Sequence, residues 1–273
     1  MDEIVEQEES EGESQELFKP KKKSFFTLLI DSFKFFTLNL PAIATIVIPV
    51  YLIVEFLVPL LSMFVDNLAE DLTGWGFIDD FLSWVIEYIT IEFLRQLVGG
   101  IAWIAVIRVI AGAMHGDKIQ SVQAIKDGTT MLPMYFVTAV IFYSLLIVSS
   151  LLLLVPGIIF AVYCAFWQYS YVLRGKGAFS ALTYSYSLVK DDFVRVFLNV
   201  FGIMVLLFIF DYFLLESLSN GIAGAVDSEE GFLYDVINAI MMALGKVFEV
   251  GIEIIFLMML FMALEEEDTE INN

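Results

Sequence analysis

The longest uncharged stretch of the chain runs from Met131 to Leu173, and it limits the fold more than any other feature. These 43 residues carry no charged side chain, and only Pro156-Gly157 interrupts their interior. A bilayer core is about 30 Å thick and takes about 20 helical residues to cross, so the stretch is twice what one crossing needs. Proline and glycine both favour a break in a helix, which predicts a chain reversal at Pro156-Gly157. We therefore expect a helical hairpin that crosses a membrane twice.

Basic residues flank this expected hairpin on both sides. Lys118 and Lys126 precede it, and Arg174, Lys176 and Lys190 follow it. Lys and Arg collect on the cytoplasmic side of membrane proteins, so both ends of the hairpin are expected in the cytoplasm.

The composition of the whole chain agrees with a membrane protein. Its apolar content of 59%, its 26 Phe residues and its mean hydropathy of +0.81 exceed what a water-soluble surface carries. The net charge of -20 lies largely in the two tails, because 8 acids fall within residues 1–18 and 5 within 265–270. We expect membrane lipids as partners and no nucleic acid, and the sequence identifies no protein partner.

The expected fold class is all-α: a polytopic membrane protein with six transmembrane helices, short cytoplasmic interfacial helices and both termini in the cytoplasm. Residues 1–18 are predicted to form a disordered acidic tail, 19–264 the membrane domain and 265–273 an acidic C-terminal tail. Ser24–Leu40 is expected to lie along the cytoplasmic surface, and the acidic connections 65–88 and 216–235 outside. The expected location is the plasma membrane, with spans at about 42–64, 91–113, 131–154, 157–173, 193–215 and 236–264.

Two short motifs resemble a known family. An apolar span ends in Leu153-Leu154-Val155-Pro156-Gly157, and a later segment carries Ala181, Leu182, Ser185, Leu188, Val189 and Lys190. This order and spacing is similar to the membrane domain of glycerophosphoryl diester phosphodiesterases and its stand-alone prokaryotic relatives. The resemblance implies a polytopic helical domain. In the fused relatives a separate soluble domain carries out hydrolysis, and no stretch of this chain has the size of that domain.

Six ionisable residues fall within or near the expected spans and are the candidate site. Charged groups inside a bilayer are costly and usually face the interior of a helix bundle. Lys246, Glu249 and Glu253 share one helix face because they are spaced by three and four residues. The six residues either form a polar cavity for an anionic ligand or pair with one another and stabilise helix packing. The cluster comprises Glu55, Arg95, Asp211, Lys246, Glu249 and Glu253.

The sequence contains no pattern that indicates catalysis. A single histidine, His115, gives no metal-ligand spacing, and no base is placed near Ser185 or Ser187. We expect no enzyme activity, no metal and no cofactor. The first hypothesis is a scaffold or lipid-interacting membrane protein of the cell envelope. The alternative is a secondary transporter or channel for a small anionic solute or lipid.

Overall fold

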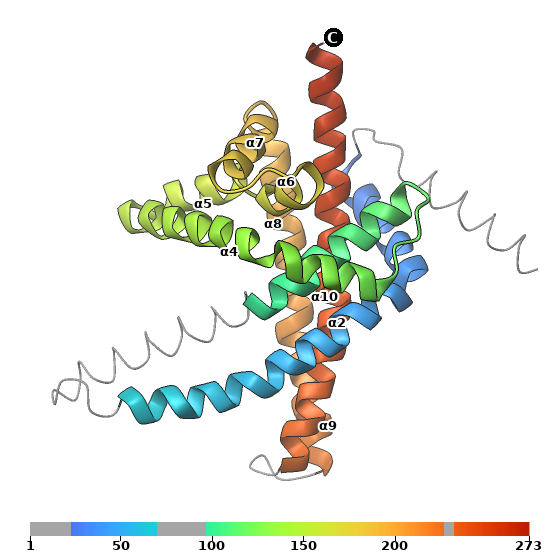
Figure 1. Cartoon of the computed structure of the whole chain (residues 1–273), viewed down its shortest axis with the longest axis vertical. Helices are drawn as coiled ribbons and strands as arrows, with labels where there is room; N and C mark the ends of the chain where they lie inside the picture. Colours follow the sequence, from blue (N-terminus) through green and yellow to red (C-terminus); the bar gives the residue numbers. More distant parts are fainter. Residues whose placement is uncertain (1–22, 70–96, 227–231, 273) are drawn as a thin grey trace, which may run out of the picture.

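The computed structural model describes residues 23–69, 97–226 and 232–272, and every regular element in these ranges is helical (Figure 1). A helix at 97–114 lies between α2 and α4. The remaining elements are α2 (Phe25–Ala69), α4 (Ser121–Leu152), α5 (Leu154–Tyr163), α6 (Trp167–Arg174), α7 (Phe179–Val189), α8 (Phe193–Ile209), the π-helix η1 (Phe210–Glu216), α9 (Ser217–Val226) and α10 (Phe232–Asn272).

Six helical segments of the described residues are long and apolar enough to cross a membrane, which agrees with the predicted number. By length and composition the chain is therefore a multi-pass membrane protein. The direction in which each segment crosses stays a prediction. The segments are Phe25–Leu57, Leu97–Met114, Ser121–Leu151, Leu154–Arg174, Phe193–Val226 and Leu233–Thr269.

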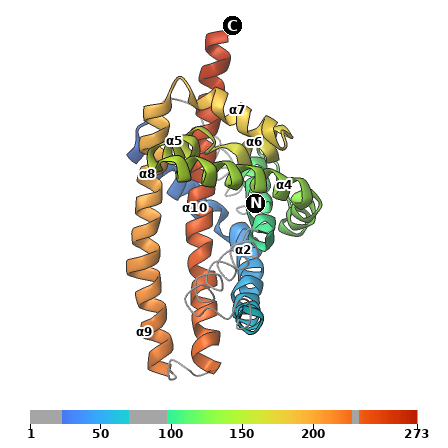
Figure 2. The same cartoon turned by 90° about the vertical axis from the view of Figure 1, so that its left-hand side faces the viewer.

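The long helices run in two directions. The rod formed by α8, η1 and α9 lies beside α10 and antiparallel to it (Figure 2). Helices α4 and α5 run across α10 instead (Figure 1). One straight membrane normal therefore cannot follow both α10 and α4. We call the end of the molecule with α7 and the C-terminus the α7 end, and the opposite end the α9 end.

The N-terminal part differs from the prediction. Ser24–Leu40 was expected to be a separate surface helix, but α2 runs without a break from Phe25 through Pro41 to Ala69. Its first half packs on α10, since the Phe25 and Phe256 ring centroids are 5.4 Å apart. Helix α2 bends along its course, as prolines within a helix predict (Figure 1).

The acidic segments near the C-terminus also differ from the prediction. Part of the expected connection 216–235 is helical, because α9 continues η1 and α10 begins at Phe232. The acidic tail 265–273 continues α10 as far as Asn272. The expected external connection 65–88 lies mostly outside the described residues.

The hairpin forms, but its break lies three residues before the predicted position. Helix α4 ends at Leu152, Leu153 is extended with φ -164° and ψ 145°, and α5 begins at Leu154. Pro156 and Gly157 therefore belong to the first turn of α5, where the N–H that proline lacks has no helical partner. Gly157 allows the two arms to approach, because a Cβ there would collide with Ser150.

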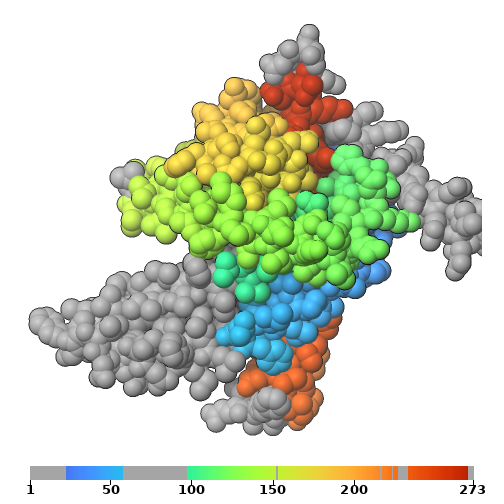
Figure 3. Space-filling model, viewed as in Figure 1, coloured from blue at the N-terminus to red at the C-terminus, as the bar shows by residue number. Residues whose placement is uncertain are grey.

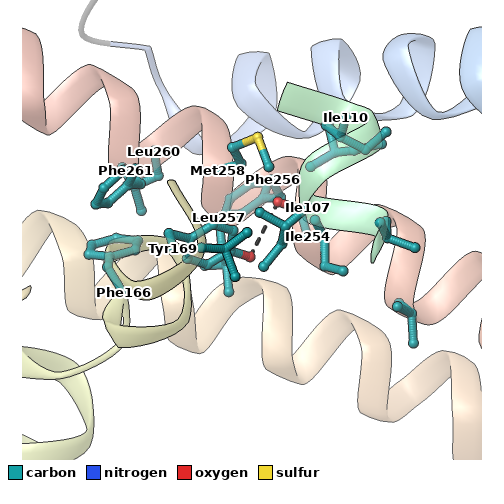
Figure 4. Packing of buried hydrophobic residues seen from close by; sticks show 14 of the residues in the cluster. Ile107, Ile110, Phe166, Tyr169, Ile254, Phe256, Leu257, Met258, Leu260 and Phe261 are labelled. Carbon is teal, nitrogen blue, oxygen red and sulfur yellow. Dashed lines mark hydrogen bonds between the residues drawn. The ribbon is translucent and has the colours of Figure 1, made fainter. Parts of the chain in front are cut away.

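The core surrounds the second half of α10. Tyr169 of α6 is fully buried there, and its hydroxyl donates a hydrogen bond to the Ile254 carbonyl at 3.3 Å (Figure 4). Ile107 and Ile110 of the helix 97–114 close another side. From one side of the molecule, α4 and the α6–α7 segment cover the middle of α10, whose last turns emerge at the top (Figure 3). The α10 helix is thus the centre on which the other elements pack.

Candidate functional site

The predicted charge cluster is partly assembled along α10. Lys246 Nζ lies 2.5 Å from Glu249 Oε2 on the same helix and 3.9 Å from Asp211 Oδ1 on η1. Asp211 Oδ1 is buried and makes no hydrogen bond with the described residues. A π-helical segment often marks a functional site, and here it turns Asp211 towards Lys246. Three of the six predicted residues therefore form one ion-pair group between η1 and α10.

Two further predicted residues lie near this group. Glu253 interacts electrostatically with Glu249 and Lys246. Tyr51 of α2 lies within electrostatic range of Glu249, Glu253 and Glu55, so these three carboxylates surround one phenol group. Arg95 lies outside the described residues.

The geometry favours the packing role for Lys246. Its side chain is about one-fifth exposed, and two carboxylates share its charge. Removing one partner of such a buried pair would leave an uncompensated charge, which is costly. An anionic ligand would have to replace a carboxylate at Lys246.

A cavity of about 600 Å³ lies between the α4–α5 hairpin, α8 and α10. Its walls are mostly apolar and aromatic. Ile158 of α5 and Phe201 and Met204 of α8 are each exposed by 44–58%, so the cavity reaches the surface between these two helices. It is lined by Trp103, Phe142, Tyr143, Leu146, Ile158, Ala161, Val162, Cys164, Ala165, Trp167, Gln168, Phe197, Val200, Phe201, Met204, Glu253 and Leu257.

Two polar side chains stand out in this cavity. Glu253 comes from the central helix α10, and Gln168 comes from α6. The Gln168 amide donates a hydrogen bond to the Tyr135 hydroxyl at 2.9 Å. The cavity therefore combines long apolar walls with hydrogen-bonding groups, which is the usual composition of a small-molecule site.

The family-motif residues serve a different purpose. Ser185 Oγ donates to the Tyr163 carbonyl at 2.8 Å and accepts from the Phe166 N–H at 3.0 Å. These two backbone groups border the break between α5 and α6, so Ser185 satisfies groups that the helices leave unpaired. Lys190, the last motif residue, is exposed. The other motif residues are buried and attach α7 to the bundle: Ala181, Leu182, Leu188 and Val189.

Sequence reasoning found Glu253 but missed the cavity around it. The lining residues come from six separate elements, and no spacing along the chain links Trp103, Trp167 and Phe201. Their only shared signal is aromatic character, which is common throughout this chain. Among the described residues, no group of three or more His, Cys, Asp or Glu side chains could hold a metal ion.

Comparisons with known proteins do not name a family for this chain. No family profile, no curated protein and no solved structure matches it. The resemblance in the Pro156-Gly157 and Ala181–Lys190 segments therefore stays a prediction, and the cavity and the charge group carry the functional argument.

Proposed function

We propose that this chain is a non-catalytic, lipid-interacting integral membrane protein that holds the acyl chain of a lipid in the cavity around Glu253. In this proposal it resides in the plasma membrane with both termini in the cytoplasm. The single observation that carries the proposal is the cavity, with its aromatic walls and its opening between α5 and α8.

The shape and chemistry of the cavity support a lipid ligand. Its volume of about 600 Å³ lies within the range of about 300–1,000 Å³ for small-molecule sites. The opening of the cavity is formed by the exposed apolar side chains of Ile158, Phe201 and Met204. An acyl chain that enters from the hydrocarbon phase therefore stays in contact with apolar groups throughout. Glu253 and Gln168 offer hydrogen bonds inside the cavity, where polar groups without partners are costly.

The serines of α7 also support a non-catalytic role. Ser185 is bonded to the backbone on both sides of the α5–α6 break. The Ser187 hydroxyl donates to the Tyr184 carbonyl at 2.7 Å within its own turn. Both hydroxyl groups therefore have structural roles, as hydrogen-bond partners of the backbone.

Fluorescence quenching tests the proposal, because Trp103 and Trp167 both line the cavity. In a Trp75→Phe, Trp84→Phe background, the remaining emission comes from these two indoles. Detergent-solubilised protein is titrated with a phospholipid brominated on its acyl chain. We expect saturable quenching at about one lipid per chain, and a loss of the saturable component in Ala161→Phe, which fills the cavity.

The matched control is Val137→Phe, on an exposed position of α4 away from the cavity lining. This variant should bind as the parent does. Quenching that rises without saturation, or that is the same in Ala161→Phe and Val137→Phe, would overturn the proposal.

A second function, a secondary transporter or channel for a small anionic solute or lipid, is favoured by one observation. Lys246, Glu249 and Glu253 form a row on α10, and Asp211 joins it from η1. The test is joint neutralisation, Arg95→Gln with Lys246→Gln, in reconstituted vesicles. If the double variant folds as the parent does but no longer retains the solute, the result supports transport. If the amount of folded protein falls as much as solute retention does, the result supports a packing role.

A further inference from the structure

A second pocket, of about 800 Å³, lies at the α7 end. It is formed by the start of α2 and by the turn that joins α7 to α8. Five charged side chains line it together with Ser24 and Asn199. They are Lys23, Lys190, Asp191, Asp192 and Arg195.

Most of these charges already have strong partners. Lys23 Nζ lies 2.7 Å from Asp31 Oδ2. Arg195 binds Glu267 at 2.8 Å, and Asp192 lies 3.8 Å from the same guanidinium. The weakest pair is Lys190 with Asp191, at 3.8 Å. Their side chains are 49% and 81% exposed, and such surface pairs contribute little to stability. A ligand can therefore replace the weak contact between Lys190 and Asp191 at little cost.

Two further features of the pocket suit a phosphate group. Helix α8 has 17 residues and begins at Phe193 with no side-chain cap, so the N–H groups of its first turn face this region. Arg195 also lines the pocket, and its Nε, a hydrogen-bond donor, has no partner in the described part of the chain. Asn199 is only 6% exposed, and its Oδ1, which also has no partner there, is an acceptor and therefore suits an ammonium and not a phosphate.

An apolar groove of about 330 Å³ shares the Phe25 ring with this pocket. It follows one face of α8 through Phe201, Val205 and Ile209, which are all exposed. Together with Leu198 of the pocket, this face rises about 16 Å, or about half of a bilayer core. Phe25 lies over Gly202, because a Cβ at that position would come within 2.7 Å of the ring.

We propose that the pocket and the groove together bind one phospholipid with a zwitterionic headgroup that carries a primary ammonium. The phosphate lies at Lys190 and the start of α8, the ammonium lies at Asp191, and an acyl chain follows the groove. Lys190 and Asp191, one cation and one anion that are paired only weakly with each other, select a zwitterion over an anion. This site shares only Phe201 with the cavity around Glu253, and all its other lining residues differ, so it goes beyond the proposed function.

Lipid binding measured by native mass spectrometry tests this proposal, using phosphatidylethanolamine, phosphatidylglycerol and phosphatidylcholine. We expect phosphatidylethanolamine to bind most tightly. Lys190→Gln should weaken both phosphatidylethanolamine and phosphatidylglycerol by about threefold to fivefold, as expected for exposed charge pairs. Asp191→Asn should weaken phosphatidylethanolamine alone. The controls are Lys126→Gln and Asp117→Asn, which change exposed charges outside the pocket.

Three outcomes would overturn the proposal. Preference for phosphatidylglycerol that Asp191→Asn leaves unchanged would show an anionic lipid site. Binding that appears only after residues 1–18 are deleted would show that the acidic tail of the chain is the occupant. Equal binding by all variants would show no site. Ala161→Phe should leave this binding unchanged, so failure here is distinguishable from failure of the Glu253 cavity.

Discussion

Helices α10 and α4 are comparably apolar, yet they occupy opposite environments. In the most apolar 18-residue window of the α10 segment 78% of the residues are buried, whereas in that of α4 only 22% are buried. Hydropathy therefore records exclusion from water, but it does not distinguish a helix packed in protein from one that faces lipid. This distinction depends on which side chains fit against a neighbouring helix.

Close packing by small residues explains the difference for α10. Gly251 sits against Phe36 of α2, since a Cβ at 251 would come within 2.6 Å of that ring. Small residues that let helices approach are the usual basis of helix association in membranes. On α4, by contrast, the side chains of Val140, Ile147 and Leu151 are exposed by 46–80%.

The largest expected effect separates the two helices directly. Phe256 of α10 is fully buried and packs against Phe25, so Phe256→Ala should lower the free energy of unfolding by about 3 kcal/mol. Ile147→Ala on α4, at a site 58% exposed, should change it by less than about 0.5 kcal/mol. Unfolding in mixed detergent micelles measures both. Equal losses would mean that α10 is not the centre of the fold.

A smaller effect is expected where α7 holds the hairpin. Ser185→Ala removes the partner of the Tyr163 carbonyl and the Phe166 N–H. It should cost about 2 kcal/mol, because both groups lie at a helix break and the Phe166 N–H is buried. The control is Ser187→Ala, whose hydroxyl bonds only within its own exposed turn. A cost for Ser187→Ala as large as that for Ser185→Ala would contradict the role of Ser185 at the break.

The smallest effect concerns the contact between α7 and the end of α10. Partial burial, followed by the hydrogen bond that Tyr184 donates to Glu265, raises the pKa of Tyr184 to about 12. The folded state thus favours the protonated phenol, whose unfolded pKa is about 10. This contribution to stability is complete below pH 10 and is lost as the pH rises from 10 to 12.

Melting temperatures at pH 8, 10, 11 and 12 measure this contribution. Tyr184→Phe should reduce the decline above pH 10, whereas Tyr186→Phe, at an exposed position of the same helix, should not. If the melting temperature falls equally in the parent and in Tyr184→Phe, the contact between Tyr184 and Glu265 does not stabilise the packing of α7 on α10.

The hairpin shows how far local patterns reach. The uncharged run 131–173 predicted two helices and a reversal. The reversal is present, but the second arm consists of two helices, α5 and α6, instead of one. The prediction placed the break at Pro156-Gly157, whereas it lies at Leu153. Proline is compatible with the first turn of a helix, so its presence marks a helix end only to within a few residues.

The charge cluster shows where local patterns stop. Spacing alone placed Lys246, Glu249 and Glu253 on one face of a helix. It could not show that η1 brings Asp211 to Lys246, or that the aromatic cavity surrounds Glu253. These contacts join residues from distant segments, and no local spacing encodes them.

The sequence by itself determined that the chain folds as long apolar helices with lipid as a solvent, because hydropathy and helix length are local properties. The tertiary structure decided which helix is central, where the hairpin turns, and which carboxylates meet Lys246. Those outcomes depend on the fit of side chains between distant segments, as between Gly251 and Phe36.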